Sequence, residues 1–197
     1  MGPVMGRTIL EMDPPEHTAH RALAKHAFTR RAIQHWREKL FGPVIDHYID
    51  RFAARGRADL VGELAFPFPV HVIAGFFDLP DDDIVLFHRW AGGIMCVAFD
   101  FERGMECARS LRDFLRPLLD RRRREPGEDV LSLLARAEFE GRQLSDEEIF
   151  GFCLLMLPAA AETTYRATSN ILFALLHHPE QMDAVRRDRS LLAQSID

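Results

Sequence analysis

Two groups of polar residues have types and spacings suited to chemistry, one near each end of the chain. Near the amino end, His17 and Arg21 are four residues apart, so on a helix their side chains lie on one face, about 6 Å apart along the axis. An imidazole and a guanidinium placed in this way can donate hydrogen bonds to one anion, a phosphate or a carboxylate. The alternative is an exposed polar helix face without a ligand, which is the more common case for such a pair alone.

The second group is an acid next to a hydroxyl, Glu162 and Thr163. Pro158 removes one backbone hydrogen bond from the helix expected here, and Thr163 can direct its hydroxyl to the carbonyl of Ala159, a contact that bends helices. An acid and a hydroxyl beside such an opening, among small alanines, could hold a water or a small ligand and relay protons to it. In the alternative, which these residues alone slightly favour, Glu162 forms a solvated salt bridge with Arg166, worth about 0.3–0.5 kcal/mol.

Both groups are expected on helices, because apolar positions recur at helical spacing along almost the whole chain and no run alternates as a half-buried strand would. Asp13 is placed to cap a helix whose first turn holds two prolines, and Glu16 supplies the acid of a capping box. This helix is expected to run to about Phe28. Further helices are expected over 29–56, as two helices or one kinked helix with a break near 42–43, and over 68–77, 81–90, 102–124 and 129–137.

The acid and hydroxyl pair is expected on the longest helix of the protein. Ser145 and Glu148 form a capping box, the strongest helix start in the chain, and the helix could continue through Pro158 to His177. Between Ile149 and Ala161 this helix is apolar on every side, which indicates a central helix enclosed by its neighbours.

Composition excludes several other classes of protein. The 197 residues, of which 47% are hydrophobic, carry a formal net charge of −5, as is ordinary for a globular chain long enough to bury a core. The longest apolar stretch falls short of the roughly 18–20 residues of a membrane span, and the amino end lacks a secretory pattern, so we expect a cytoplasmic protein without a membrane partner. The basic run 121–124 is interpreted as a solvated helix end, not as a nucleic-acid patch.

Motifs for metals and nucleotides give no support to other enzyme classes. Cys96, Cys107 and Cys153 are an odd number without a close pair, which disfavours a disulfide framework and a cysteine-based zinc site. No Glu is followed three residues later by His, as a di-iron bundle requires. A His-Glu-x-x-His motif and a glycine-rich phosphate loop are absent as well.

Taken together, the two groups and the residues around them resemble one family. The stretch MDPPEHTAHRALAKHAFTRRAI, residues 12–33, resembles the C-helix region of bacterial soluble cytochromes P450, and AETTYRATSNILFALLHHPEQ, residues 161–181, resembles their long I helix and its exit. Between them, ELAFPFPVHVIAGFFDLP and EDVLSLLARAEFEGRQLSDEEI are similar to family segments. The resemblance implies a mainly α fold, a partial cytochrome P450 domain over residues 1–197 with helices C to J, without the family's Glu-x-x-Arg helix and cysteine loop.

The resemblance implies a haem b cofactor and residues that hold its edge. His17 and Arg21 would bind a haem propionate, which is the anion that their geometry suits, and Phe28 would be an apolar neighbour of the macrocycle. None of the three cysteines lies in the glycine-rich context of the family's iron ligand. We therefore assign no metal ligand here, and the axial cysteine is expected outside this chain.

The resemblance also gives the second group a role on the distal face of the haem. Residues 159–164 stand where the family has Ala-Gly-x-Glu-Thr-Thr, so Ala159 and Ala160 would line the cofactor and Glu162 and Thr163 would deliver protons to dioxygen. Ala160 occupies the place usually held by glycine. Its methyl group would narrow the groove for dioxygen and the relay water.

The function implied by the resemblance is that of a haem-dependent monooxygenase, of which this chain is a fragment. The parent enzyme would use dioxygen and electrons from a ferredoxin or flavodoxin-type donor to hydroxylate a small apolar molecule. The isolated chain is expected to be inactive, because a haem without its axial thiolate lacks the electron donation that favours oxygen-bond cleavage. The alternative is a non-enzymatic helical module that holds a ligand or a partner in an apolar cleft.

Overall fold

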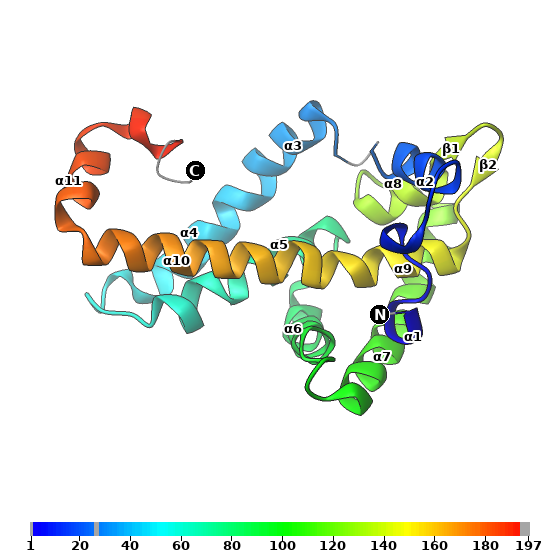
Figure 1. The fold of residues 1–197 in the computed structure, drawn as a ribbon, viewed down its shortest axis with the longest axis horizontal. Helices are drawn as coiled ribbons and strands as arrows, with labels where there is room; N and C mark the ends of the chain where they lie inside the picture. Colours follow the sequence, from blue (N-terminus) through cyan, green and yellow to red (C-terminus); the bar gives the residue numbers. More distant parts are fainter. Residues whose placement is uncertain (1, 26–27, 194–197) are drawn as a thin grey trace.

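A computed structural model describes residues 2–25 and 28–193, and these are folded almost entirely into helices (Figure 1). An antiparallel hairpin with two residues in each strand, β1 (Glu138–Phe139) and β2 (Arg142–Gln143), was not expected from the sequence. The mainly α fold class is confirmed. The helical elements in chain order are α1 (Gly2–Met5), η1 (Ile9–Glu11), α2 (Glu16–Lys25), α3 (Arg30–Trp36), η3 (Arg37–Phe41), α4 (Gly42–Ala53), η4 (Val61–Ala65), α5 (Pro67–Phe76), α6 (Asp81–Met95), α7 (Phe101–Arg124), α8 (Val130–Arg136), α9 (Asp146–Met156), η5 (Leu157–Glu162), α10 (Thr163–His177), α11 (Pro179–Arg187) and η6 (Arg189–Leu192).

One long helix, formed by α9, η5 and α10 without interruption, crosses the whole molecule (Figure 1). The capping box predicted at its start is confirmed, since the hydroxyl of Ser145 accepts from the Glu148 amide while the Glu148 carboxylate accepts from the Ser145 amide. The helix ends at His177, and Pro179 opens α11. The sequence therefore predicted both ends of the central helix.

Prolines accompany all three π-helical segments of the described chain. Pro43 and Pro67 each lie two residues after the end of η3 and η4, respectively, and Pro158 lies inside η5. Proline has no amide hydrogen and its ring clashes with the carbonyl four residues earlier, whereas the wider π turn moves that carbonyl away. For this reason α3, η3 and α4 form one continuous helix, which decides between the two alternatives for residues 29–56.

The core surrounds the amino-terminal half of the long helix. Five of its side chains are fully buried, namely Ile149, Phe150, Cys153, Leu154 and Leu157. They pack in one cluster with leucines of α7 and α8 and with apolar side chains of α5 and α6, for example Leu111, Leu115, Leu131, Ile73 and Phe87. The predicted central position of this helix is confirmed, with the exception of Ala159, which is exposed.

The predicted start of the helix that follows Asp13 is wrong by two residues. The two prolines after Asp13 form a turn, and α2 begins at Glu16. Glu16 does not complete a capping box there; its carboxylate pairs instead with Arg7, at 2.5 Å. The local pattern could not reveal this pairing, because Arg7 lies in a preceding segment of the chain.

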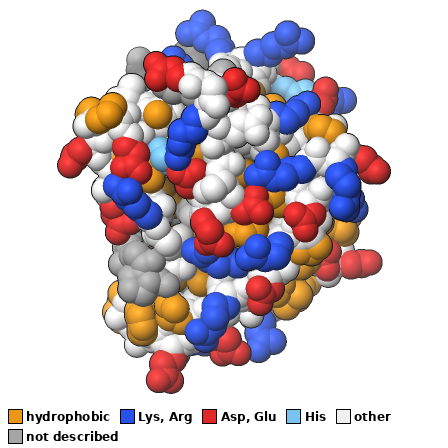
Figure 2. All heavy atoms as spheres, turned by 90° about the vertical axis from the view of Figure 1, so that its right-hand side faces the viewer, with side chains coloured by type: hydrophobic (Ala, Val, Ile, Leu, Met, Phe, Trp, Pro, Cys, Tyr) orange, Lys and Arg blue, Asp and Glu red, His pale blue; other side chains and the backbone are white. Residues whose placement is uncertain are grey.

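The interpretation of the run 121–124 as a solvated helix end is wrong for Arg122. It is only 8% exposed, and its guanidinium donates to Asp129 at 2.8 Å and to Asp78 at 2.7 Å. Asp129 in turn accepts from Ser132 at the start of α8. A buried cation requires such partners, and the pairing ties α7 to α8. Over the outside of this end of the molecule, basic and acidic side chains are interspersed (Figure 2).

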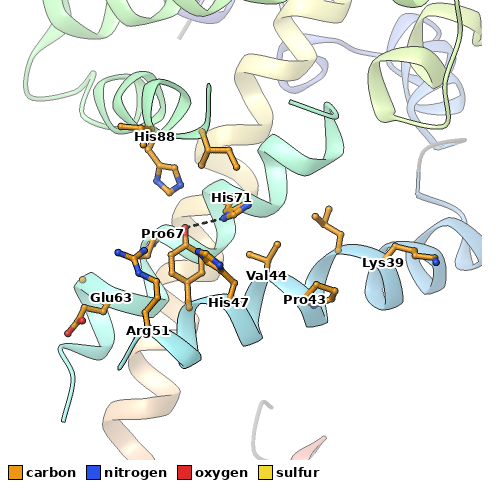
Figure 3. A pocket seen from close by; sticks show the side chains of 14 residues that line it. Lys39, Pro43, Val44, His47, Arg51, Glu63, Pro67, His71 and His88 are labelled. Atoms are coloured by element: carbon orange, nitrogen blue, oxygen red, sulfur yellow. Dashed lines mark hydrogen bonds between the residues drawn. The ribbon is translucent and has the colours of Figure 1, made fainter. Parts of the chain in front are cut away.

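A cleft of about 650 Å³ opens between α4, α5 and α6 (Figure 3). Helices α5 and α6 also pack against η5 of the long helix. Among the described residues, no helix combines the length and the hydropathy needed to cross a membrane.

Candidate functional site

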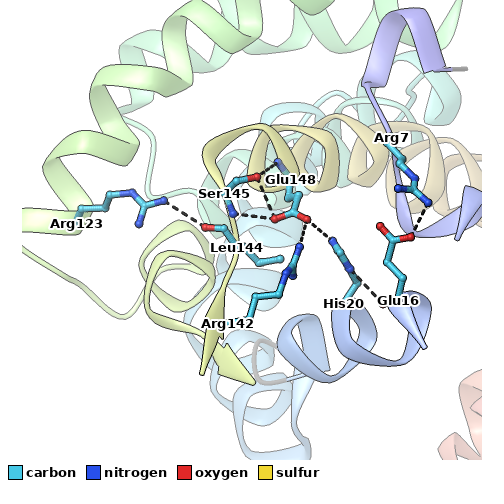
Figure 4. Close-up of polar contacts among 8 residues, drawn as sticks. All are labelled: Arg7, Glu16, His20, Arg123, Arg142, Leu144, Ser145 and Glu148. Atoms are coloured by element: carbon cyan, nitrogen blue, oxygen red, sulfur yellow. Dashed lines mark hydrogen bonds and ion pairs between the residues drawn. The ribbon is translucent and has the colours of Figure 1, made fainter. Parts of the chain in front are cut away.

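Helix α2, which carries His17 and Arg21, is attached to the start of the long helix by a partly buried polar contact (Figure 4). Nε2 of His20 lies 2.7 Å from Oε1 of Glu148, and Nδ1 lies 3.2 Å from the carbonyl oxygen of Glu16. Both ring nitrogens therefore face oxygen atoms of other residues. We define His20, Arg142, Ser145 and Glu148 as the α2 anchor.

The carboxylate of Glu148 is the centre of the α2 anchor. Partial burial raises its pKa, but hydrogen bonds from the Ser145 amide, Arg142, the Ser145 hydroxyl and His20 outweigh this effect and hold the pKa at about 2. Two of these bonds measure 2.8 and 3.0 Å, from the amide and the hydroxyl of Ser145. The side chain consequently stays ionised at neutral pH and fixes α2 and β2 to the long helix.

The cations predicted to bind an anion lie on α2 beside this anchor. His17 is partly exposed and Arg21 is exposed. Within the described chain, neither side chain has a hydrogen bond or an ion pair, whereas the neighbouring residues His20 and Leu23 are buried. The imidazole of His17 and the guanidinium of Arg21, one turn apart on α2, can therefore both donate hydrogen bonds to one carboxylate.

Phe28 lies against the same helix that carries the acid and the hydroxyl. Its ring is 42% exposed, and its centroid is 6.2 Å from that of Phe152 in α9. Phe152 and Leu155 also line a narrow pocket together with His20 and Ala24 of α2. Apolar side chains therefore lead from α2 along the long helix toward η5.

Thr163 makes the contact that the sequence predicted. Its hydroxyl donates to the carbonyl oxygen of Ala159 at 2.7 Å, and the backbone between these residues is the π turn η5. Thr163 and Ala159 are exposed, Ala160 is partly exposed and Ala161 is buried. Because the hydroxyl hydrogen is used by the carbonyl, the oxygen lone pairs of Thr163 remain available to accept from a water.

Glu162 forms the ion pair that was the alternative to a relay role. Nε and Nη2 of Arg166 donate to Oε1 of Glu162 at 3.0 and 2.7 Å. The side chain of Glu162 is 33% exposed and that of Arg166 is 68% exposed. Both bonds reach Oε1, so Oε2 has no partner in the described part of the chain. The salt bridge is thus present, and it leaves one oxygen of the acid open to solvent.

The structure brings some of the predicted residues together and not others. Ala159, Glu162 and Thr163 lie at or next to one π turn, and Phe28 packs against the preceding part of the same helix. No hydrogen bond or ion pair within 2–25 and 28–193 joins that turn to the cations of α2. Sequence reasoning missed His20 as the partner of Glu148, and a histidine on the apolar face of a helix was the only local signal.

The cysteines differ sharply in their surroundings. Cys153 is completely buried in α9, and burial raises the pKa of its thiol far above the ordinary value, which keeps it neutral. Cys107 is buried and Cys96 is exposed. In the described ranges, no group of three or more His, Cys, Asp or Glu side chains is arranged to hold a metal ion.

The residues present fit the edge and one face of a haem. The unused cationic donors of His17 and Arg21 match the charge of a propionate, and the open turn with the outward lone pairs of Thr163 suits the side at which dioxygen and water bind. Among the described residues, we assign no ligand for the iron.

Comparisons with known proteins point to one family. The sequence pattern of the cytochrome P450 family matches residues 98–195. Cytochrome P450 107B1 of Saccharopolyspora erythraea is 33% identical over 99% of this chain and 48% of its own length, and cytochrome P450 monooxygenase PikC of Streptomyces venezuelae is 34% identical over 98% and 47%. The crystal structure of CYP109E1 from Bacillus megaterium in complex with testosterone superposes with a TM-score of 0.90 at 31% identity, over 97% of this chain and 52% of that one.

The agreement in sequence and in fold extends over nearly all of this chain. The chain spans about half the length of the curated relatives that it matches. From the fold, the geometry of the π turn and these relatives, we conclude that the chain belongs to the bacterial cytochrome P450 family.

Proposed function

We propose that this chain supplies the distal face and one propionate clamp of a haem-dependent monooxygenase that hydroxylates a small apolar molecule. The observation that carries the proposal is the hydroxyl of Thr163 bonded to the carbonyl of Ala159 across a π turn, directly beside an acid with one open oxygen. When bound, the haem supplies dioxygen binding and activation.

The clamp follows from the fixed position of α2. The α2 anchor holds the helix through an ionised carboxylate, while His17 and Arg21 keep their donors unused. Hydrogen bonds from cationic donors to a carboxylate are the strong, charge-assisted kind. A haem propionate placed between these two side chains would give α2 the partner that it lacks.

The relay follows from the distribution of donors and acceptors at η5. Thr163 gives its hydrogen to Ala159, so its oxygen accepts a hydrogen bond from a water and fixes the orientation of that water. Glu162 is held by Arg166 through Oε1, and Oε2 exchanges protons with solvent. In this proposal a proton passes from solvent to Oε2 and on to the ordered water.

The relatives support the proposed substrate class. CYP109E1 was crystallised with testosterone, and another relative carries the name steroid C26-monooxygenase, from Mycobacterium tuberculosis. We propose an apolar molecule of this general kind for the whole enzyme, and a ferredoxin or flavodoxin-type protein as the electron donor.

Titration of this chain with haem tests the proposal. The double variant His17→Ala/Arg21→Ala is expected to bind haem about tenfold or more weakly, because two charge-assisted hydrogen bonds are lost. Lys25→Ala, which removes an exposed cation from the last turn of the same helix, is the matched control and should bind as the unchanged chain does. Equal haem affinity for the double variant and the control would overturn the clamp.

The ferrous carbon monoxide complex of the same sample tests the assignment of the iron ligand. No cysteine of this chain is assigned to the iron, so the spectrum should lack the strongly red-shifted band of thiolate-ligated haem, and the isolated chain should not hydroxylate. Appearance of that band would show that one of its three cysteines ligates iron.

A further inference from the structure

The cleft between α4, α5 and α6 is separate from the candidate haem site, because none of the residues assigned to haem or to proton delivery lines it. Its volume of about 650 Å³ lies within the range of pockets that hold small organic ligands. Part of the lining is apolar and comes from η3, α4, α5 and α6, namely Leu40, Pro43, Val44, Pro67, Ile84 and Val85.

His88 gives the cleft an unsatisfied polar group. It projects from α6 toward the side chains of α4 and α5 (Figure 3). Its Nε2 atom is buried and has no hydrogen-bond partner among the described residues. A buried polar nitrogen without a partner costs free energy that a ligand can recover by bonding to it.

The opposite wall of the cleft presents polar side chains in fixed positions. Tyr48 is 5% exposed, and its hydroxyl lies 3.2 Å from Nδ1 of His71. The guanidinium of Arg51 lies 5.8 Å from the centroid of the Tyr48 ring. The phenol and the guanidinium therefore occupy defined places at one end of the cleft, opposite His88.

The charges that line the cleft favour an anion. Arg51 and Lys39 both line it, and neither has an ion pair with a described residue. Glu63 is the acidic side chain of the described lining, and Arg55 already pairs with it. Unpaired cations facing an apolar wall are complementary to a molecule with a negative head and an apolar body.

We infer that this cleft binds a small organic carboxylate, with the carboxylate between Arg51 and His88 and the apolar body along Val44, Ile84 and Val85. A metal ion is disfavoured as occupant, since within the described residues no group of three ligating side chains has a suitable arrangement. The inference does not depend on haem binding.

Protonation should accompany carboxylate binding. Burial, and the nearby His71, lower the pKa of His88 to about 4, so the ring is neutral in the empty cleft. A bound carboxylate favours the imidazolium and raises this pKa. At a pH between the pKa of His88 in the empty cleft and its pKa in the occupied cleft, binding takes up a proton. Affinity for the carboxylate therefore rises as pH falls. Other charged or titratable groups also line the cleft and contribute to its electrostatic potential, namely Lys39, His47, Tyr48, Arg51, Glu63 and His71.

Fluorescence titration of the full chain with 2-naphthoate, compared with uncharged 2-naphthamide, tests the inference. Naphthoate should bind at least tenfold more tightly than the amide, about 1.4 kcal/mol. Arg51→Gln and His88→Leu should each weaken naphthoate binding about tenfold and leave amide binding unchanged. Arg57→Gln, which removes an exposed cation outside the lining, is the matched control and should have no effect.

His88→Leu separates a binding role from a structural one. The leucine fills similar space without a buried unpaired nitrogen, so circular dichroism should show an intact fold while naphthoate affinity falls and no longer rises as pH decreases. Equal affinities for naphthoate and naphthamide, or unchanged naphthoate affinity in both Arg51→Gln and His88→Leu, would overturn the inference. Because these variants leave α2 and η5 unaltered, such a failure would not bear on the proposed haem function.

Discussion

Replacing Glu148 with glutamine removes a negative charge at the point where α2, β2 and the long helix meet. The carboxylate accepts hydrogen bonds from His20, Arg142 and both the amide and the hydroxyl of Ser145. Glutamine has nearly the same shape, but its amide nitrogen cannot accept, so the two donors at the replaced oxygen lose their partner, either His20 and Arg142 or the amide and hydroxyl of Ser145. The variant therefore tests the α2 anchor with little change in packing.

The magnitude follows from the pKa of Glu148. Its displacement from the ordinary 4.5 to about 2 corresponds to at most about 3 kcal/mol in the free energy of unfolding at neutral pH. Arg142, one of the donors, is 47% exposed, so solvent screens part of this interaction, and we expect about 1.5 kcal/mol.

The pH dependence has a definite sign. Because the pKa is lower in the folded chain than in the unfolded chain, the stabilisation is fully present above about pH 4.5 and is lost as pH falls toward about 2. The difference in unfolding free energy between Glu148→Gln and the unchanged chain should therefore shrink over this interval.

Urea unfolding followed by far-ultraviolet circular dichroism measures this difference. Glu147→Gln, on the same helical turn, is the control: Glu147 is 67% exposed and pairs with Arg112 and Arg116 at the surface, so its loss should cost less than about 1 kcal/mol. If Glu148→Gln is no more destabilising than Glu147→Gln at neutral pH, or if its effect persists unchanged near pH 2, the reasoning about the anchor is wrong.

Three further predictions follow from other parts of the structure. Arg122→Leu leaves Asp129 buried without its cation and should lower the free energy of unfolding by about 3 kcal/mol, measured in urea, whereas the double variant Arg122→Leu/Asp129→Asn should recover part of the loss. In an enzyme completed with the cysteine-bearing half of a relative, Thr163→Ala should raise peroxide release per electron consumed, and Thr163→Ser should not. Equal peroxide release per electron in these two variants would contradict the proposed proton relay. A thiol reagent should modify exposed Cys96 rapidly in the folded chain and buried Cys153 only after unfolding, and mass spectrometry distinguishes the two sites.

Local patterns in the sequence determined the elements and their internal contacts. The capping box of Ser145 and Glu148 and the bond from Thr163 to Ala159 join residues three and four positions apart, so helical geometry alone brings them together. The same holds for the ion pair of Glu162 with Arg166. The family resemblance carried the assignment of roles, which no spacing could provide.

Only the tertiary structure decided which distant side chains meet. The contact of His20 with Glu148 spans 128 positions, Asp78 reaches Arg122 across 44, and His88 enters a cleft whose other walls are α4 and α5. Helical periodicity states which face of a helix is buried but not against which neighbour. A buried polar residue acquires its partner, or lacks one, only when separate helices pack together, and this is why the anchor and the cleft could not be predicted from the sequence.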